Sequence, residues 1–116
     1  MAFRGTNGAK NWVADLSADQ DLYLWNNKSE VHRGFYSAYQ LLQEDLRQSL
    51  APIIDQHPFS TILVTGHSLG GALALLAALD IKLFFGINSK MMKLYTFGQP
   101  RVGDKSFSEF VSKQFN

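Results

Sequence analysis

The sequence predicts an α/β fold in which a mostly parallel sheet carries flanking helices. Short runs of apolar and β-branched residues alternate with longer segments of helical periodicity. The expected strands are residues 1–4, 22–25, 62–65 and 92–97, and the expected helices are residues 9–16, 31–56, 69–83 and a segment that begins at Asp104. Strands that alternate with helices favour parallel pairing through right-handed crossovers. Because a strand and a helix stand at the two ends of the sequence, we expect this single domain to be incomplete at both ends.

Composition and charge exclude several classes of protein. The 116 residues are 46% hydrophobic with a formal net charge of +1, as in one globular domain or part of one. The Lys and Arg residues do not cluster, which argues against nucleic-acid binding but leaves hydrophobic contact with a lipid surface open. With no cysteine and three scattered histidines, the sequence predicts no disulfide, no thiolate metal site and no zinc site. It contains no transmembrane segment and no signal-peptide pattern.

The segment Gly66-His67-Ser68-Leu69-Gly70 links the strand 62–65 to an Ala/Leu-rich helix. Such a tight turn needs small residues around the serine, because a side chain at Gly66 or Gly70 would press the strand and the helix apart. The serine hydroxyl is then held out from the sheet edge, and the first amides of the helix point towards the atom that it attacks. This motif in this context is typical of α/β-hydrolases and makes Ser68 the candidate nucleophile.

Residues 9–16 have the periodicity of a short amphipathic helix, with Ala9, Trp12, Val13 and Leu16 on one face. One interpretation is a small surface helix docked by Trp12. The other is a movable flap, whose apolar face covers a site when closed and contacts lipid when open. Periodicity alone favours the surface helix and does not exclude the flap.

The next segment is predicted to be a short strand, residues 22–25, followed by a polar turn over residues 26–29. Asn27-Lys28-Ser29 also fits the acceptor pattern for N-glycosylation, which matters only in a secreted protein.

Residues 31–56 form the longest helical pattern. We expect its apolar face to pack on the sheet and its polar face to meet water. The apolar face comprises Phe35, Tyr39, Leu42, Leu46, Leu50 and Ile53, and the polar face Gln40, Gln43, Glu44, Arg47 and Gln48. Pro52 predicts a kink or a break near Leu50.

The helix 69–83 is apolar on every side, so we expect it to lie between other elements. Asp104 is a plausible cap for the last helix. In parallel sheets, sites lie beyond the carboxyl ends of the strands, where Ser68, Thr6 and Gln99 are expected to meet.

A serine nucleophile needs a base and a carboxylate, and neither is evident in the sequence. His67 is expected to pack beneath the turn, because neighbouring side chains at a strand end point to opposite sides. His57 precedes the strand and is placed roughly 20 Å away at the wrong sheet edge. His32, which is expected to start the long helix, is the one histidine whose position suits a catalytic base. The alternative is that it has a structural role near the site.

The acidic residues fit no better. Asp80 lies roughly 18 Å along the helix from Ser68. Asp104 has the position of a cap, and Asp15 lies in the possible flap. These residues therefore provide no complete triad of serine, histidine and carboxylate.

Five blocks together resemble one family, the class 3 or fungal-type lipases of the α/β-hydrolase fold. They occur in the family's order and cover nearly the whole chain. The blocks are residues 3–6 (FRGT), 11–16 (NWVADL), 31–35 (VHRGF), 65–72 (TGHSLGGA) and 97–104 (FGQPRVGD).

The resemblance implies an esterase that opens lipid acyl esters through an acyl-enzyme, without metal or cofactor. A lipid–water interface is the expected place of this reaction. Ser68 is then the nucleophile, and Leu69 and Thr6 form the oxyanion hole. The block with Asn11, Trp12, Val13, Asp15 and Leu16 falls where these lipases carry their lid, which reverses the preference above in favour of a flap. Asp15 is expected to meet Thr6 when the lid opens.

The sequence also departs from the family pattern. In the family, the catalytic Asp and His follow the block 97–104 by tens of residues, so we expect this sequence to be an internal piece of a longer enzyme. Secretion is expected from the resemblance alone. The alternatives are a non-catalytic lipase-like module that binds a partner or a lipid, and a truncated, inactive fragment that does not fold alone.

Overall fold

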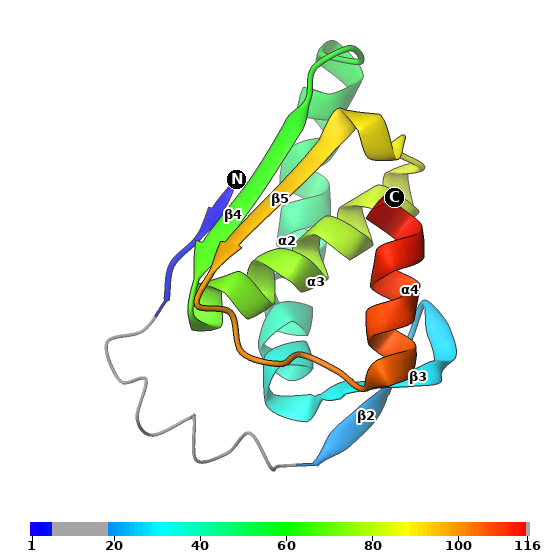
Figure 1. The fold of residues 1–116 in the computed structure, drawn as a ribbon. Helices are drawn as coiled ribbons and strands as arrows, with labels where there is room; N and C mark the ends of the chain where they lie inside the picture. Colours follow the sequence, from blue (N-terminus) through cyan, green and yellow to red (C-terminus); the bar gives the residue numbers. More distant parts are fainter. Residues whose placement is uncertain (6–18, 116) are drawn as a thin grey trace.

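The computed structural model describes residues 1–5 and 19–115. Its strands and helices follow one another along the chain as in Figure 1. They are β1 (Ala2–Phe3), β2 (Gln20–Tyr23), β3 (Asn26–His32), α2 (Arg33–Gln56), β4 (Ile62–His67), α3 (Leu69–Phe85), the short 3₁₀ helix η2 (Ser89–Met91), β5 (Met92–Phe97) and α4 (Lys105–Phe115).

The main sheet has the strand order β1-β4-β5, with both pairs parallel. Six residues of β4 pair in register with six of β5, from Ile62 opposite Met92 to His67 opposite Phe97. Because these two strands run in the same direction, both end at the edge where Ser68 follows β4. The α/β class with a parallel sheet is thereby confirmed.

Helix α3 lies against β1, β4 and β5, and α2 packs on α3 (Figure 1). Val64 and Met92 of the sheet are buried against small residues of α3, Ala74 and Ala78. This arrangement explains why α3 is apolar all round: one side meets the sheet and another meets α2. The expected sandwiched position is confirmed.

The segment after residue 19 differs from the prediction, since it forms an antiparallel hairpin. The turn falls at Leu24 and Trp25, and residues 26–29, predicted to be a polar turn, belong to β3. Val31 and His32, predicted to start the long helix, end this strand, and α2 begins at Arg33. The alternation of exposed and buried residues in β3 is irregular because the register shifts between Leu22 and Tyr23.

Helix α2 continues without interruption through Pro52, so a break at this position is excluded, and the alternative of a kink stays a prediction. Its inner face also differs from the prediction. Phe35, Tyr36 and Tyr39 are buried, whereas Leu42 and Ile53 are 43% and 53% exposed.

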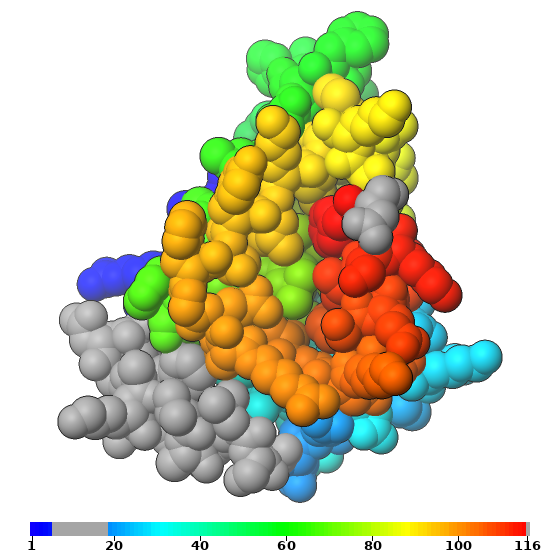
Figure 2. All heavy atoms as spheres, viewed as in Figure 1, coloured from blue at the N-terminus to red at the C-terminus, as the bar shows by residue number. Residues whose placement is uncertain are grey.

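The opposite face of the sheet is exposed among the described residues. Leu63 of β4 is 47% exposed, and Tyr95 and Phe97 of β5 are 53% and 61% exposed. Figure 2 shows β5, in yellow to orange, at the surface of the molecule. In the described part of the chain, no helix combines the length and the apolar character needed to cross a membrane.

Candidate active site

Ser68 stands in the one-residue turn between β4 and α3, with φ 59° and ψ −122°. Among the described residues, it is the only residue other than glycine with a positive φ. Its N–H donates to the carbonyl oxygen of Phe97 at 2.9 Å, and its own carbonyl oxygen accepts from the amide of Gly71 at 3.0 Å. These two bonds hold the turn between the end of β5 and the first turn of α3. The backbone is thus fixed in a conformation that an L-residue adopts only under constraint.

The glycines on either side allow the strand and the helix to approach closely. A Cβ atom at Gly66 would overlap the carbonyl group of Gly70, and a Cβ at Gly70 would overlap the carbonyl oxygen of Phe3 in β1. The predicted steric reason for these two glycines is confirmed. The consequence is that β1, β4 and the start of α3 meet at the serine.

Leu69 is the first residue of the 17-residue helix α3. Its amide donates no hydrogen bond to another described residue, as is expected at a helix N-terminus, where the first amides lack intrahelical partners. These amides and the helix dipole favour negative charge close to Ser68. Gln99 also lies close to this turn, because a Cβ at Gly71 would stand 3.3 Å from its Cβ.

The other predicted site residues lie outside the described residues. These are Thr6 and the residues assigned to the lid, namely Asn11, Trp12, Val13, Asp15 and Leu16.

None of the three histidines is placed as a base by the described structure. His67 is exposed on the open face of the sheet, so the prediction that it packs beneath the turn is wrong. His57 follows α2 and lines a cavity together with Ile62, the first residue of β4, at the strand end opposite Ser68.

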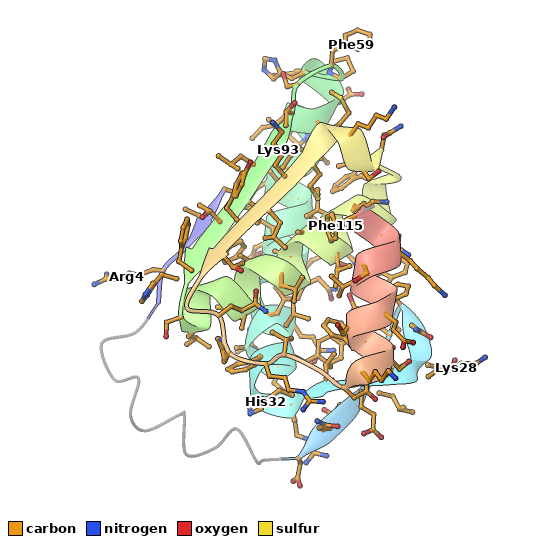
Figure 3. All side chains as sticks on the ribbon, viewed as in Figure 1. Arg4, Lys28, His32, Phe59, Lys93 and Phe115 are labelled. Carbon is orange, nitrogen blue, oxygen red and sulfur yellow. The ribbon has the colours of Figure 1, made fainter. Side chains whose placement is uncertain are left out.

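His32 has a structural role at the foot of α2 (Figure 3). Its Nδ1 accepts from the amide of Phe35 at 3.2 Å and caps the helix, and its ring stacks on that of Phe35 at 4.1 Å. Its backbone N–H donates to the carbonyl oxygen of Val102 at 2.7 Å, which ties β3 to the segment after β5. Since Nδ1 is an acceptor here, the neutral ring carries its proton on Nε2.

Of the acidic residues considered as partners of a base, Asp80 and Asp104 are engaged in structural contacts. The carboxylate of Asp104 accepts from the amide of Phe107 at 2.8 Å, so the predicted cap of α4 is confirmed.

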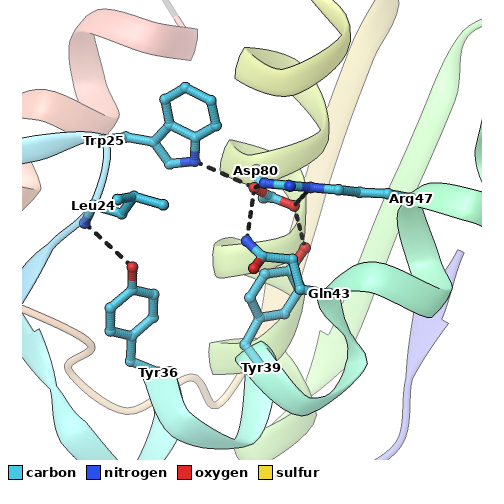
Figure 4. A network of polar contacts seen from close by, with 7 residues as sticks. All are labelled: Leu24, Trp25, Tyr36, Tyr39, Gln43, Arg47 and Asp80. Atoms are coloured by element: carbon cyan, nitrogen blue, oxygen red, sulfur yellow. Dashed lines mark hydrogen bonds and ion pairs between the residues drawn. The ribbon is translucent and has the colours of Figure 1, made fainter.

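Asp80 of α3 is buried and is the centre of a polar network that also holds α2 and the hairpin (Figure 4). Arg47 donates to both carboxylate oxygens, from Nε to Oδ2 at 3.1 Å and from Nη2 to Oδ1 at 2.6 Å. Tyr39 donates to Oδ2 at 2.8 Å, and Gln43 and Trp25 donate to Oδ1 at 3.0 and 3.2 Å. All four donors surround one carboxylate, so its charge is compensated within the fold.

This network also governs the ionisation of its members. Burial, together with the charge of Asp80 and the hydrogen bond to it, raises the pKa of the Tyr39 hydroxyl well above its ordinary value. The hydrogen bond to Asp80 raises the pKa of Arg47, although burial opposes that change. Both donors therefore keep their protons around the carboxylate.

The sequence prediction missed this network and assigned Gln43 and Arg47 to the water-facing side of α2. Two signals were present in the sequence. Asp80 is the one acidic residue of a helix whose only other charged residue is Lys82, and Tyr39, Gln43 and Arg47 recur every four residues, on one face of α2.

An open cavity of about 580 Å³ lies between α3, β5 and α4. Figure 2 shows the hollow between the orange segment that follows β5 and the red helix α4. Leu75, Gln99 and Phe107 contribute to its lining, whereas Ser68 does not. Within residues 1–5 and 19–115, no cluster of His, Asp and Glu has the geometry of a metal site.

A parallel sheet, a strained serine between a strand and a helix, and close glycine contacts around that serine define an α/β-hydrolase. Comparison with known proteins gives the family. The class 3 lipase family matches the chain over residues 1–116, and the chain belongs to that family.

The relatives are lipases of greater length. The chain is 42% identical to a lipase of Rhizomucor miehei over 112 residues, which are 96% of this chain and 31% of that lipase. It is 34% identical to the secreted mono- and diacylglycerol lipase A of Penicillium cyclopium, over 100% of this chain and 37% of the relative. A solved triacylglycerol lipase whose catalytic centre is formed by a serine protease triad superposes with a TM-score of 0.90 at 40% identity, covering 97% of this chain and 43% of its own. The chain thus spans between 31% and 43% of the length of these proteins.

Proposed function

We propose that the protein containing these residues is a carboxylic-ester hydrolase that acts on acylglycerols or similar lipid esters, with Ser68 as its nucleophile. The observation that carries the proposal is the strained backbone of Ser68, with φ 59°, at the carboxyl end of a parallel strand. Strain of this kind is found where the position of a reacting atom matters more than local stability. The three relatives are named as lipases, which supports lipid esters as the substrate class.

In the proposed reaction, the hydroxyl oxygen of Ser68 attacks the ester carbonyl carbon while a base accepts its proton. The amide of Leu69, with the amide and hydroxyl of Thr6, stabilises the negative charge on the carbonyl oxygen. Each such donor contributes roughly 3 kcal/mol to lowering the barrier. The base returns the proton to the alcohol as the ester C–O bond breaks. It then takes a proton from water, which attacks the acyl carbon, and Ser68 regains its proton as the fatty acid leaves.

We assign the base and its carboxylate to residues outside this sequence, so the 116 residues form part of one catalytic domain. The engaged positions of His32 and Asp80 support this assignment. The serine protease triad of the solved relative supports a histidine and an aspartate in these roles. We also propose that the protein is secreted, as the Penicillium relative is.

A fluorophosphonate probe tests the nucleophile on the full-length protein. We expect one label per molecule on Ser68, and we expect its loss in Ser68→Ala. The matched control is Ser60→Ala, because Ser60 is exposed in the loop before β4 and should not affect labelling. Labelling that survives Ser68→Ala excludes Ser68, and a protein that neither labels nor hydrolyses esters is a non-catalytic lipase-like module.

We further propose that residues 11–16 form a lid whose apolar face meets lipid, with Asp15 contacting Thr6 when the lid is open. The proposal rests on the family pattern and on the amphipathic spacing of Trp12, Val13 and Leu16. Trp12→Ala should reduce hydrolysis of an emulsified ester more than hydrolysis of a soluble one, measured side by side. Equal effects on the two substrates would instead indicate a fixed surface helix.

A further inference from the structure

We propose that Asn27 is an N-glycosylation site, modified when the protein passes through a eukaryotic secretory pathway. The proposal rests on the secretion proposed above and is independent of the hydrolase activity. Among the complete triplets of this sequence, Asn27-Lys28-Ser29 is the only one with Asn followed at the second position by Ser or Thr and without an intervening proline.

The acceptor residue lies on the exposed side of the β2–β3 hairpin, two residues after the turn. Asn27 and Lys28 are both exposed, and the side chain of Lys28 extends away from the molecule in Figure 3. The carboxamide of Asn27 makes no hydrogen bond to any other described residue. A bulky oligosaccharide can therefore project into solvent from this position without displacing the core.

Ser29, the third residue of the triplet, is in a different environment. Its side chain is fully buried, at 0% exposure. Its hydroxyl oxygen accepts from Nδ2 of Asn26 at 2.9 Å and lies 3.1 Å from the hydroxyl oxygen of Ser106 in α4. A transferase that recognises this hydroxyl cannot reach it once the hairpin is packed on α4. The modification is therefore placed on the nascent chain, before these two elements dock.

The chemical step is the transfer of a sugar from a lipid-linked oligosaccharide diphosphate. Nδ2 of Asn27 forms a bond to C1 of the first sugar, while the bond between C1 and the diphosphate oxygen breaks. The lipid diphosphate leaves with the electron pair, and Nδ2 loses one proton. The product retains one N–H and the carbonyl group of the Asn27 side chain.

The hairpin also exposes apolar side chains that a glycan on it would help to keep in solution. Leu22 is 63% exposed and Leu24 is 70% exposed. Surface patches of this kind favour association, and a solvated oligosaccharide on the same hairpin opposes it.

The test is to produce the full-length protein with its own N-terminus in a eukaryotic host and to analyse the peptide that contains Asn27. We expect the glycan to be removed by a peptide N-glycosidase with conversion of the asparagine to aspartate, detected by mass spectrometry. Asn27→Gln and Ser29→Ala should abolish the modification. Ser29→Thr, which keeps a hydroxyl, and Asn26→Gln, which removes the neighbouring hydrogen bond but not the triplet, should retain it.

An unmodified Asn27 in the protein made with its own N-terminus overturns the proposal. Retention of a glycan on this peptide in Ser29→Ala overturns it as well. Labelling of Ser68 by the fluorophosphonate should be unchanged in Asn27→Gln, so failure of this inference and failure of the proposed activity are observed separately.

Discussion

At the scale of single residues, Ser68 has a backbone conformation that lowers stability but fixes the position of this residue. A φ of 59° with a ψ of −122° is easily adopted by glycine but costs an L-residue of order 1–3 kcal/mol. The hydrogen bond from the Ser68 amide to Phe97 and the close contact of Gly66 with Gly70 maintain that conformation. The surrounding elements thus fix the backbone of Ser68 before any substrate binds, which is what the proposed nucleophile requires.

This strain predicts that Ser68→Gly stabilises the fold while removing the hydroxyl of the proposed nucleophile. Relative to Ser68→Ala, which keeps a Cβ and the strain, Ser68→Gly should raise the free energy of unfolding by about 1 kcal/mol. Urea unfolding of the two full-length variants measures the difference, and neither should react with a fluorophosphonate. Equal stabilities would show that the turn is not strained.

At the scale of elements, the Asp80 network connects three parts of the chain that are distant in sequence. Trp25 belongs to the hairpin, Tyr39, Gln43 and Arg47 to α2, and Asp80 to α3 (Figure 4). The same helix α3 begins at the serine turn, so the network fixes the hairpin and α2 relative to the helix that carries the site. A buried carboxylate is tolerated here because every donor around it is oriented towards it.

Removing one of the two charges, Asp80 or Arg47, should lower the free energy of unfolding by more than removing both. Asp80→Asn leaves Arg47 beside a neutral amide, and the expected loss in unfolding free energy is about 3 kcal/mol. Asp80→Asn combined with Arg47→Met should recover much of that loss, because no unpaired charge remains and the amide still pairs with Tyr39, Gln43 and Trp25. Urea unfolding of the full-length protein measures the difference. The control Asp45→Asn changes an exposed carboxylate of α2 and should have an effect within about 0.5 kcal/mol. A similarly small effect of Asp80→Asn would contradict the assigned role.

The elements that could be predicted are those whose sequence pattern is set by the burial of apolar side chains. β5 was predicted with its observed bounds, and β4 and α3 to within two residues, because apolar runs and glycines mark their ends. The hairpin could not be predicted in the same way, since β3 begins with the polar residues 26–30, whose strand conformation depends on pairing with β2. The inner face of α2 was misassigned for a similar reason, because Gln43 and Arg47 point inwards to a partner on another helix.

At the scale of the molecule, the predicted site divides into a described part and a part that stays a prediction. Ser68 and Leu69 occupy the expected place at the carboxyl end of β4, because their geometry depends on contacts within a few residues and with the neighbouring strands. The roles of Thr6 and of the lid block rest on the family pattern. A base for Ser68 could not be found from the sequence, and the structure places the described histidines at a helix cap, at the far end of β4 and on the open face of the sheet.

The open face of the sheet predicts how the 116 residues behave when produced alone. Leu63 of β4 and Tyr95 and Phe97 of β5 lie on the same face of the sheet and are between 47% and 61% exposed. Strand β5 is also an edge of the described sheet, so its backbone can pair with another chain. The isolated polypeptide should bind a hydrophobic dye and self-associate with rising concentration, measured by analytical ultracentrifugation.

A variant tests whether the exposed sheet face, rather than general instability of the polypeptide, causes the association. Replacing Leu63, Tyr95 and Phe97 together by Thr keeps strand propensity and should reduce dye binding and association, because the apolar patch is removed while the covered face of the sheet is unchanged. The matched control is Leu41→Thr, since Leu41 is 84% exposed on α2, away from the sheet face, and its replacement should leave association as it was. A monomeric isolated polypeptide with a sharp cooperative thermal transition would show instead that this face needs no covering partner for the fold to persist.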